Sequence, residues 1–320
     1  MPKIIGNITG DDDYTHPLGP ESNFNESVYF NYFDRDADRG GFIRIGNRAN
    51  EGYAEMTIIV YNPDGSAMFN YKKPEISSND GWDAGGVKVD VLVPGEKIRT
   101  RYQGSAVFLE DPRAMADPGR AFKDNPFKKL QIDLEHQGVG PLYGHVGKAG
   151  DGNDFARAHT EQHMKVSGTL QIEGEEPISI DGHGLRDHSW GPRFWQSTPS
   201  YRWITGNFGD DLGMAISKIG DRVGGVFHRG DELIRISELD LETDYEAGTR
   251  FHTALRANLK LTDGTAHSLT GTVKGFIPLR NRRSGSNTTI GEGMTEYLLD
   301  GDRVGYGLSE YLDQPEDPGA

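Results

Sequence analysis

Two histidines, an aspartate, two arginines and two tryptophans fall within the short stretch GHGLRDHSWGPRFW at 182–195. Histidine can donate and accept a proton near neutral pH, and a neighbouring arginine can hold an oxyanion or a carboxylate through its planar guanidinium group. Tryptophan rings beside them would exclude water and contact an apolar ligand. The stretch therefore predicts an acid–base site, with Asp187, His188 and Arg193 as its catalytic residues.

A strand over this stretch would divide its side chains between two faces. Alternation places Arg186, His188 and Trp190 on one face and Asp187 and Ser189 on the other.

The Gly-Pro pair that follows would end the strand and turn Arg193 and Trp195 back toward it. A structural interpretation is also open, in which the charged residues form an ion-pair knot over one end of a barrel. In that case Arg186 would pair with Asp187, or Arg193 would pair with an acid elsewhere.

Four further segments interleave aromatic and charged side chains. They are FNESVYFNYF (24–33), FIRIGNRANEGYAE (42–55), YRWITGNF (201–208) and GEGMTEYLLDGDRVGYGLSEYLD (291–313). On strands, this mixture suits the interior of a ligand-holding barrel better than a solid core. The side chains that we expect to contact a ligand are Glu26, Tyr29, Arg44, Arg186, Trp190, Trp195, Tyr201, Trp203 and Glu310.

The elements that would position these residues are strands. Apolar and polar residues alternate in VKVDVLV (87–93), LQIDL (130–134), TLQIEG (169–174) and ALRANLKL (254–261). This is the period of a half-buried strand, whereas segments with helical periodicity are nearly absent. The pattern predicts an all-β, antiparallel protein in sandwich or barrel form.

Two irregular segments interrupt the predicted strands. Residues 110–129 are rich in proline, aspartate and lysine, which indicates a short helix or a loop across a barrel mouth. Residues 147–163 are predicted to link two halves of the chain, giving β domains over residues 1–160 and 161–320.

Charge and composition exclude several classes of function. The net charge of −15 argues against nucleic acid or an anionic membrane surface as a partner. The chain contains no cysteine, and no apolar run approaches the roughly 18 residues of a membrane span. The N-terminus has no signal-peptide pattern, so a cytoplasmic protein is expected.

No motif predicts a metal ion or another cofactor. The acidic run from Asp34 to Gly40 resembles a calcium loop, but Arg39 and Ile45 stand where that loop needs glycine and glutamate. The sequence also contains no glycine-rich phosphate loop.

The pattern NESVYFNYFD … GGFIRIGNRANEGYAE … GHGLRDHSWGPRFW … GEGMTEYLLDGDRVGYGLSEYL resembles the AttH and carotenoid-hydratase (hydroxyneurosporene synthase) superfamily, over residues 24–313. Its most specific part is RDHSWGPR. The resemblance implies two lipocalin-like β-barrels packed side by side. Relatives include hydratases of isoprenoid double bonds and fungal enzymes that catalyse cyclisations such as Diels–Alder reactions. The resemblance assigns no catalytic triad to these positions.

We therefore expect a cofactor-independent enzyme acting on an apolar small molecule, such as a terpenoid, a steroid or an aromatic catabolite. Acid–base chemistry would hydrate a carbon–carbon double bond or form one by dehydration. His188 or a buried carboxylic acid would protonate the alkene, tryptophan rings would stabilise the cation, and Asp187 would orient His188 or activate water.

Two alternatives remain, an isomerase or cyclase in the same cavity and a lipocalin-like carrier of an apolar ligand. A carrier needs no convergent acid–base groups, so the directions of Asp187 and His188 separate it from an enzyme. Whether the protein forms a homo-oligomer is left open.

Overall fold

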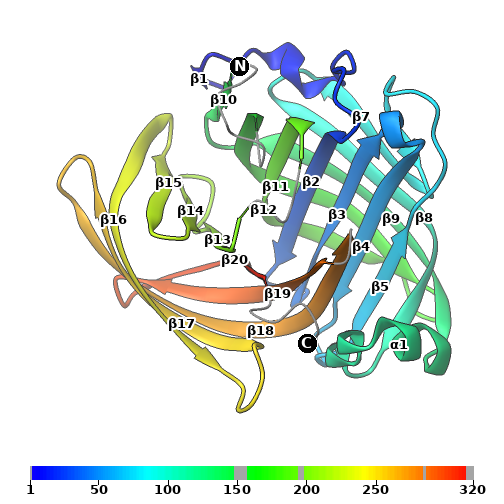
Figure 1. Ribbon diagram of the computed structural model, residues 1–320. Coiled ribbons are helices and arrows are strands. Elements are labelled where there is room, and N and C mark those ends of the chain that lie inside the picture. The colour runs from blue at the N-terminus through cyan, green and yellow to red at the C-terminus, as the bar shows by residue number, and fades with distance from the viewer. Residues whose placement is uncertain (1, 148–156, 194–197, 284–285, 315–320) are drawn as a thin grey trace.

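The computed structural model describes residues 2–147, 157–193, 198–283 and 286–314, and strands dominate them (Figure 1). The all-β, two-barrel prediction is confirmed. The first sheet contains β1 (Ile4–Gly6), β2 (Phe24–Asp34), β3 (Arg39–Arg48), β4 (Tyr53–Tyr61), β5 (Ala67–Lys72), β6 (Trp82–Ala84), β7 (Val87–Val93), β8 (Lys97–Leu109), β9 (Phe127–Gly138), β10 (Leu142–Val146), β11 (Ala158–Ile172) and β12 (Ile178–Pro192).

Hydrogen-bonded pairing closes part of this sheet into a ring. The ring runs β11-β12-β2-β3-β4-β5-β8-β9, and β9 returns to β11. The strands β10 and β1 extend from β11, and β7 and β6 extend from β8. This ring is called the first barrel.

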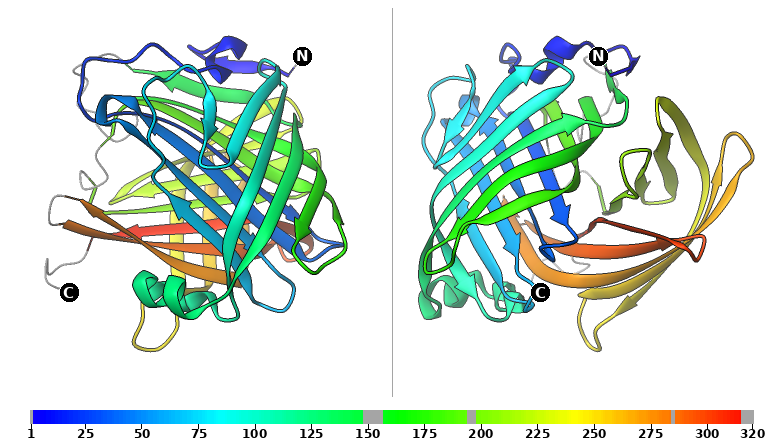
Figure 2. Two further views of the ribbon diagram at one scale, coloured as in Figure 1. Left: turned by 90° about the vertical axis from the view of Figure 1, so that its right-hand side faces the viewer. Right: turned by 180° about the vertical axis from the view of Figure 1, so that it is seen from behind.

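The second barrel is a closed ring in sequence order. It contains β13 (Ser200–Asn207), β14 (Leu212–Ile219), β15 (Arg222–Arg229), β16 (Glu232–Tyr245), β17 (His252–Leu261), β18 (Ala266–Arg283), β19 (Ser286–Leu299) and β20 (Arg303–Asp313). The two barrels lie side by side, and β18, β19 and β20 form the wall of the second that approaches the first (Figures 1 and 2).

The sheets divide the chain between Pro192 and Ser200. The predicted division at residue 160 falls inside β11, which belongs to the first barrel. The polar composition of 147–163 suggested a linker, but residues from Ala158 onward pair with β10 and β12 on both sides. Residues 148–156 of that segment lie outside the described residues.

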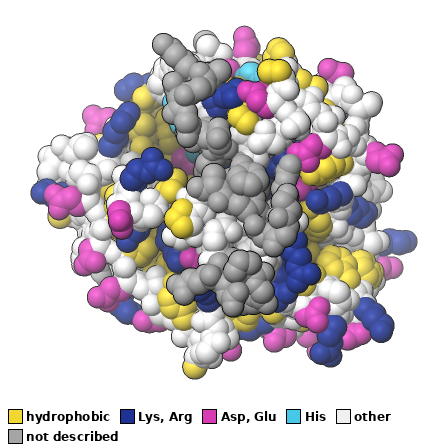
Figure 3. All heavy atoms as spheres, viewed as in Figure 1, with side chains coloured by type: hydrophobic (Ala, Val, Ile, Leu, Met, Phe, Trp, Pro, Cys, Tyr) yellow, Lys and Arg dark blue, Asp and Glu magenta, His cyan; other side chains and the backbone are white. Residues whose placement is uncertain are grey.

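Short helices complete the described chain. They are the 3-10 helices η1 (Gly10–Asp13), η2 (Ala49–Glu51) and η3 (Pro112–Ala116) and the α-helix α1 (Pro118–Asp124). η3 and α1 occupy the segment 110–129, where a short helix or loop was predicted. The described residues include no helix with the length and hydropathy that crossing a bilayer requires. Acidic and basic side chains are interspersed on the face that Figure 3 shows.

Alternation on the strands separates two apolar cores. On β2, Val28, Phe30 and Tyr32 point into the first barrel, whose interior is filled by buried side chains. Tyr29 and Phe33 point the other way and pack in a cluster that includes side chains of the second barrel. The polar–aromatic segments 24–33 and 42–55 therefore do not line a hollow barrel interior, because the interior positions of the first barrel form a core of buried apolar side chains.

The N-terminal segment closes one end of the first barrel through a buried ion pair. Asp13 in η1 contacts Arg186 on β12, and both side chains are at least 96% buried. A second oxygen of Asp13 accepts a hydrogen bond from Gly95 N at 2.6 Å, while Arg186 also donates to Gln162 at 2.8 and 2.9 Å. Arg186 therefore forms a structural ion pair at the end of a barrel, as one interpretation of the sequence predicted. Its partner is Asp13 and not Asp187.

Replacing Asp13 with asparagine should lower the free energy of unfolding by about 3 kcal/mol, because Arg186 would keep its charge in a buried site without a carboxylate. Urea denaturation measures the change. Glu238→Gln, which breaks an exposed pair with Lys260, is the matched control and should cost less than about 1 kcal/mol. Equal effects of the two variants would contradict a buried anchoring role.

Candidate active site between the two barrels

Strand β12 sends the predicted catalytic residues to opposite faces. His188 lies opposite Val28 on β2 and points into the first barrel, whereas Asp187 lies opposite Tyr29 and points outward. Leu185, on the same face as Asp187, packs in a cluster with side chains of the second barrel. The predicted alternation is therefore confirmed, and it separates His188 from Asp187.

His188 belongs to a buried network around Glu26. The Glu26 carboxylate accepts hydrogen bonds from His188 Nε2 at 3.0 Å, His16 Nδ1 at 2.6 Å and Asn79 Nδ2 at 2.5 Å. Burial alone would raise the pKa of Glu26, but the hydrogen bonds from the two histidines outweigh it and lower the pKa to about 2. The imidazole of His16 stacks on Trp190 at 3.9 Å between ring centroids.

Asp187 belongs to a different network between the barrels. Its carboxylate is hydrogen-bonded to His159 Nε2. Burial would lower the pKa of His159, but the charges of Asp187 and Glu161 outweigh it and raise the pKa to about 9. Glu161 accepts hydrogen bonds from Tyr143 Oη at 2.6 Å and, across the interface, from Trp203 Nε1 at 2.9 Å. The pair His159–Asp187 is thus an imidazolium held by a carboxylate at neutral pH.

Two glutamates of the second barrel complete this network. Glu292 on β19 lies directly opposite Glu310 on β20, and their exposed fractions are 4% and 9%. Burial raises the pKa of Glu292 to about 8 against the opposing charge of Arg44. Burial likewise raises the pKa of Glu310 to about 7, although Arg193 lowers it. Both side chains can therefore hold a proton near neutral pH, which is the property that a general acid needs.

Glycines explain how the second barrel presents these glutamates. In the sequence GEGMTE, glycine alternates with the outward-facing glutamate and methionine. A Cβ on Gly293 would lie 2.6 Å from His252 Nε2 and 2.7 Å from Ser309 Oγ, so only glycine fits this inward position. The glycines thus allow tight packing inside the barrel while Glu292 faces the first barrel.

Two arginines lie at the same interface. Arg193 Nη1 donates to Ser189 Oγ at 2.7 Å, and burial together with the charge of Arg44 lowers the pKa of Arg193 to about 10. Arg44 Nη1 lies 3.9 Å from Glu55 Oε2. We call the interfacial group of charged residues the inter-barrel cluster. Its members are Arg44, His159, Glu161, Asp187, Arg193, Glu292 and Glu310.

The cluster is accessible at one side. The side chains of His159 and Asp187 are 29% and 18% exposed, whereas Glu161, Glu292 and Glu310 are buried.

The structure sorts the predicted site residues into two groups. Asp187 and Arg193 lie at the inter-barrel cluster, together with the predicted contact residues Tyr29, Arg44, Trp203 and Glu310. His188 lies in the first barrel, together with Glu26, Arg186 and Trp190. Tyr201 packs against Leu312 beside Trp203. Trp195 lies outside the described residues.

Sequence reasoning missed His159 and Glu161 and did not select Glu292. His159 and Glu161 lie in the segment that was interpreted as a linker. Residues 159–163, HTEQH, are all polar, so no apolar–polar alternation marked the start of β11. Glu292 lies within the 291–313 segment, but nothing local indicated that it lies opposite Glu310.

Two groups of described side chains bring possible metal ligands within 4.8 Å of one another. They are His16, Glu26 and His188, and His159, Glu161 and Asp187. In both groups the carboxylates already accept hydrogen bonds from protein donors, so metal binding would have to displace these contacts.

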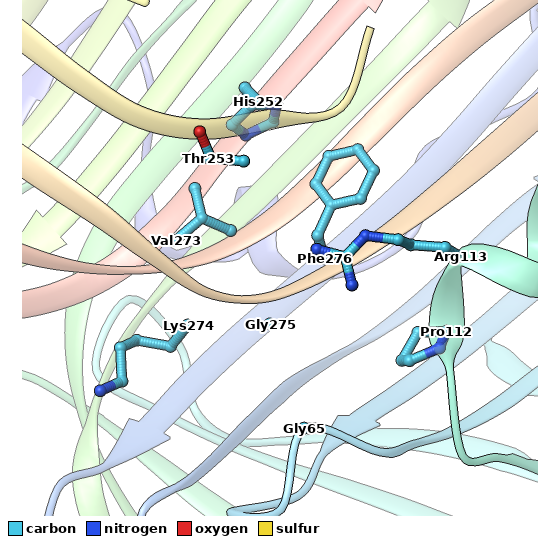
Figure 4. A pocket seen from close by; sticks show the side chains of 9 residues that line it. All are labelled: Gly65, Pro112, Arg113, His252, Thr253, Val273, Lys274, Gly275 and Phe276. Carbon is cyan, nitrogen blue, oxygen red and sulfur yellow. The ribbon is translucent and has the colours of Figure 1, made fainter. Parts of the chain in front are cut away.

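A separate hollow lies at the other end of the interface, between η3 and strands β17 and β18 (Figure 4). Arg113, His252 and Phe276 are among its lining residues, and its volume is about 100 Å³. Sites for small molecules usually measure about 300–1,000 Å³. This hollow is therefore too small to be the main substrate site.

Comparison with known proteins identifies the family. The family model described as "Domain of unknown function (DUF7064)" matches residues 9–315. The chain belongs to this family. A search of curated proteins finds no match.

Solved structures share the fold. A putative AttH from Nitrosomonas europaea matches with a TM-score of 0.58 and 15% identity, covering 92% of this chain and 96% of that one. CghA matches with a TM-score of 0.55 and 10% identity, covering 100% and 98%. At these identities the matches establish the fold alone, and it is the fold that the resemblance implied.

Replacing Glu292 with glutamine should stabilise the protein at alkaline pH. The unfolded chain ionises this carboxyl above its ordinary pKa of 4.5, whereas the folded protein does so only above about 8. The free energy of unfolding therefore falls as pH rises between these values, by up to ~4 kcal/mol at pH 8. Glutamine removes this loss. Urea denaturation at pH 4 and pH 8 should show a gain for Glu292→Gln at pH 8 only, and a loss of stability at pH 8 would contradict the assignment.

Replacing Glu26 with glutamine should change the free energy of unfolding in the opposite direction, by destabilising the protein. The folded pKa of about 2 lies below the ordinary 4.5, so the carboxylate stabilises the fold above pH 4.5, and this contribution is lost as pH falls toward 2. Glu26→Gln should therefore lower the free energy of unfolding by ~3 kcal/mol at pH 7. The same assay measures it, and a variant as stable as the parent at pH 7 would refute the network.

Proposed function

We propose that this protein is a cofactor-independent enzyme that performs acid–base chemistry on a carbon–carbon double bond of a small, largely apolar molecule. The observation that carries the proposal is the pair Glu292 and Glu310, buried opposite each other with pKa values of about 8 and 7. A carrier has no need for proton donors that are costly to bury, whereas an acid catalyst does.

In the proposed hydration, Glu310 is the general acid. Its carboxyl proton adds to one alkene carbon, and the positive charge develops on the other carbon. Water bonds to that carbon and loses a proton to the Glu310 carboxylate, so the enzyme returns to its starting state. The opposing charges of Arg193 and Arg44 favour the ionised form of Glu310 during this step.

Aromatic rings adjoin the proposed reaction centre. Trp203 lies opposite Glu310 across strands β13 and β20, and its ring centroid is 5.3 Å from that of Tyr29. Their π faces would stabilise a developing carbocation, and their surfaces would contact an apolar substrate. His188 has no part in this proposal, because it lies on the other face of β12, where its imidazole is hydrogen-bonded to Glu26.

Isotope incorporation tests this proposal. Purified protein is incubated in water labelled with deuterium and heavy oxygen, with extracts rich in terpenoids, steroids and aromatic acids, and products are read by mass spectrometry. We expect a product with one heavy oxygen and one carbon-bound deuterium, formed at least about 10²-fold more slowly by Glu310→Gln. Glu238→Gln, an exposed substitution, should match the parent.

The other outcomes separate the alternatives. Deuterium without heavy oxygen would identify an isomerase or a proton-triggered cyclase at the same cluster. A ligand that is retained but unaltered would favour a carrier. Full turnover by Glu310→Gln would overturn the assignment of Glu310 as the general acid.

A further inference from the structure

A row of small side chains crosses three strands beside the proposed reaction centre. Ser189 on β12 lies opposite Ser27 on β2, and Ser27 lies opposite Gly46 on β3. The two hydroxyl groups are 3.2 Å apart, and both serines are buried. Serine and glycine at these positions make a low floor on the face that the first barrel turns toward the second.

Polar groups with buried, unpartnered atoms adjoin this floor. A Cβ on Gly46 would lie 3.1 Å from Arg44 Nη2 and 3.2 Å from Asn25 Oδ1, so both groups meet above this glycine. Arg44 Nη2 and both polar atoms of the Asn25 side chain are buried and have no hydrogen-bond partner among the described residues. A buried donor without a partner is costly, which indicates that a ligand group completes this site.

The chemistry of the floor favours an anion. Arg44, the Asn25 amide and one serine hydroxyl can donate hydrogen bonds to a ligand, because the other hydroxyl proton is used between Ser27 and Ser189. Arg193 Nη1 reaches the floor through Ser189 Oγ. The nearest acid in the same row is Glu55, which lies opposite Gly46 on β4.

Glu55 does not fully neutralise Arg44. It lies 3.9 Å from Arg44 Nη1, but 3.6 Å from Arg48 and 3.4 Å from Lys73. Arg48 in turn contacts Glu51 at 3.0 Å. Arg44 also acts on Glu292 and Glu310, but burial raises the pKa of both carboxyls, so near neutral pH they neutralise Arg44 only in part. The side of Arg44 that faces the floor is therefore positive and rich in donors.

We infer that this floor is a carboxylate-binding subsite, formed by Asn25, Ser27, Arg44 and Ser189 over Gly46. The inference rests on the proposed function, because it assigns the substrate class as apolar molecules that carry a carboxylate. The guanidinium of Arg44 would hold the carboxylate, and the Asn25 amide would donate a further hydrogen bond. The apolar part of the substrate would then lie along Tyr29, which is opposite Arg44 on β2, toward Trp203 and Glu310.

Matched acids and amides test the subsite. Binding of cinnamate and decanoate to the full chain is measured by calorimetry against cinnamamide and decanamide, which keep the shape and lack the charge. We expect each carboxylate to bind at least about tenfold more tightly than its amide. Arg44→Gln should remove this preference, and Gly46→Ala should weaken carboxylate binding by filling the floor. Arg256→Gln, in an exposed ion pair, should change nothing.

The outcomes distinguish this inference from the proposed function. Equal affinity for acids and amides, no binding of either carboxylate, or an unchanged preference in a folded Arg44→Gln protein would overturn the subsite. Glu310→Gln should keep the carboxylate preference while losing turnover. Carboxylate binding together with undiminished turnover by Glu310→Gln would uphold the subsite and reject the acid.

Discussion

The candidate site depends on the cost of placing a negative charge between two packed barrels. Glu292 and Glu310 face each other across adjacent strands, and burial is the largest cause that raises the pKa of each carboxyl. Apolar packing around Phe42 and Met294 removes the water that would otherwise solvate these carboxylates. The interface that joins the barrels therefore also raises the pKa of both carboxyls toward neutral pH.

Strand β12 connects this site to the rest of the molecule. One of its faces supplies Arg186 and His188, which hold the N-terminal segment through Asp13 and Glu26. The other face supplies Asp187 and Ser189, which contact His159 and Arg193 at the interface. Because both networks share one strand, the ion pairs in the first barrel help to fix the positions of Asp187 and Ser189 at the interface.

Local sequence patterns predicted the strands and the faces to which their side chains point. The strand alternation, the two faces of β12 and a short helix or loop within 110–129 were predicted from local patterns, whereas the two-barrel fold was implied by the family resemblance. The set of residues that forms the site could not be predicted from the sequence, because the site joins residues far apart in the chain, such as Trp203 and Glu161. Polarity at 147–163 concealed the start of β11, and with it His159. The charged and aromatic residues clustered within 182–195 suggested a single site. A strand, however, points successive side chains to opposite faces, so these neighbours are divided between two faces.

The central claim is that two interfacial glutamates are protonated near neutral pH. The most direct measurement is an NMR pH titration of the protein labelled with carbon-13 at the glutamate carboxyls, with Glu292→Gln and Glu310→Gln spectra to assign the two signals. The account predicts two carboxyls that titrate near pH 8 and pH 7, well above the ordinary 4.5, with each signal missing from its own variant. Two glutamates that ionise near pH 4.5 would contradict the account, because neither would then hold a proton to donate at neutral pH.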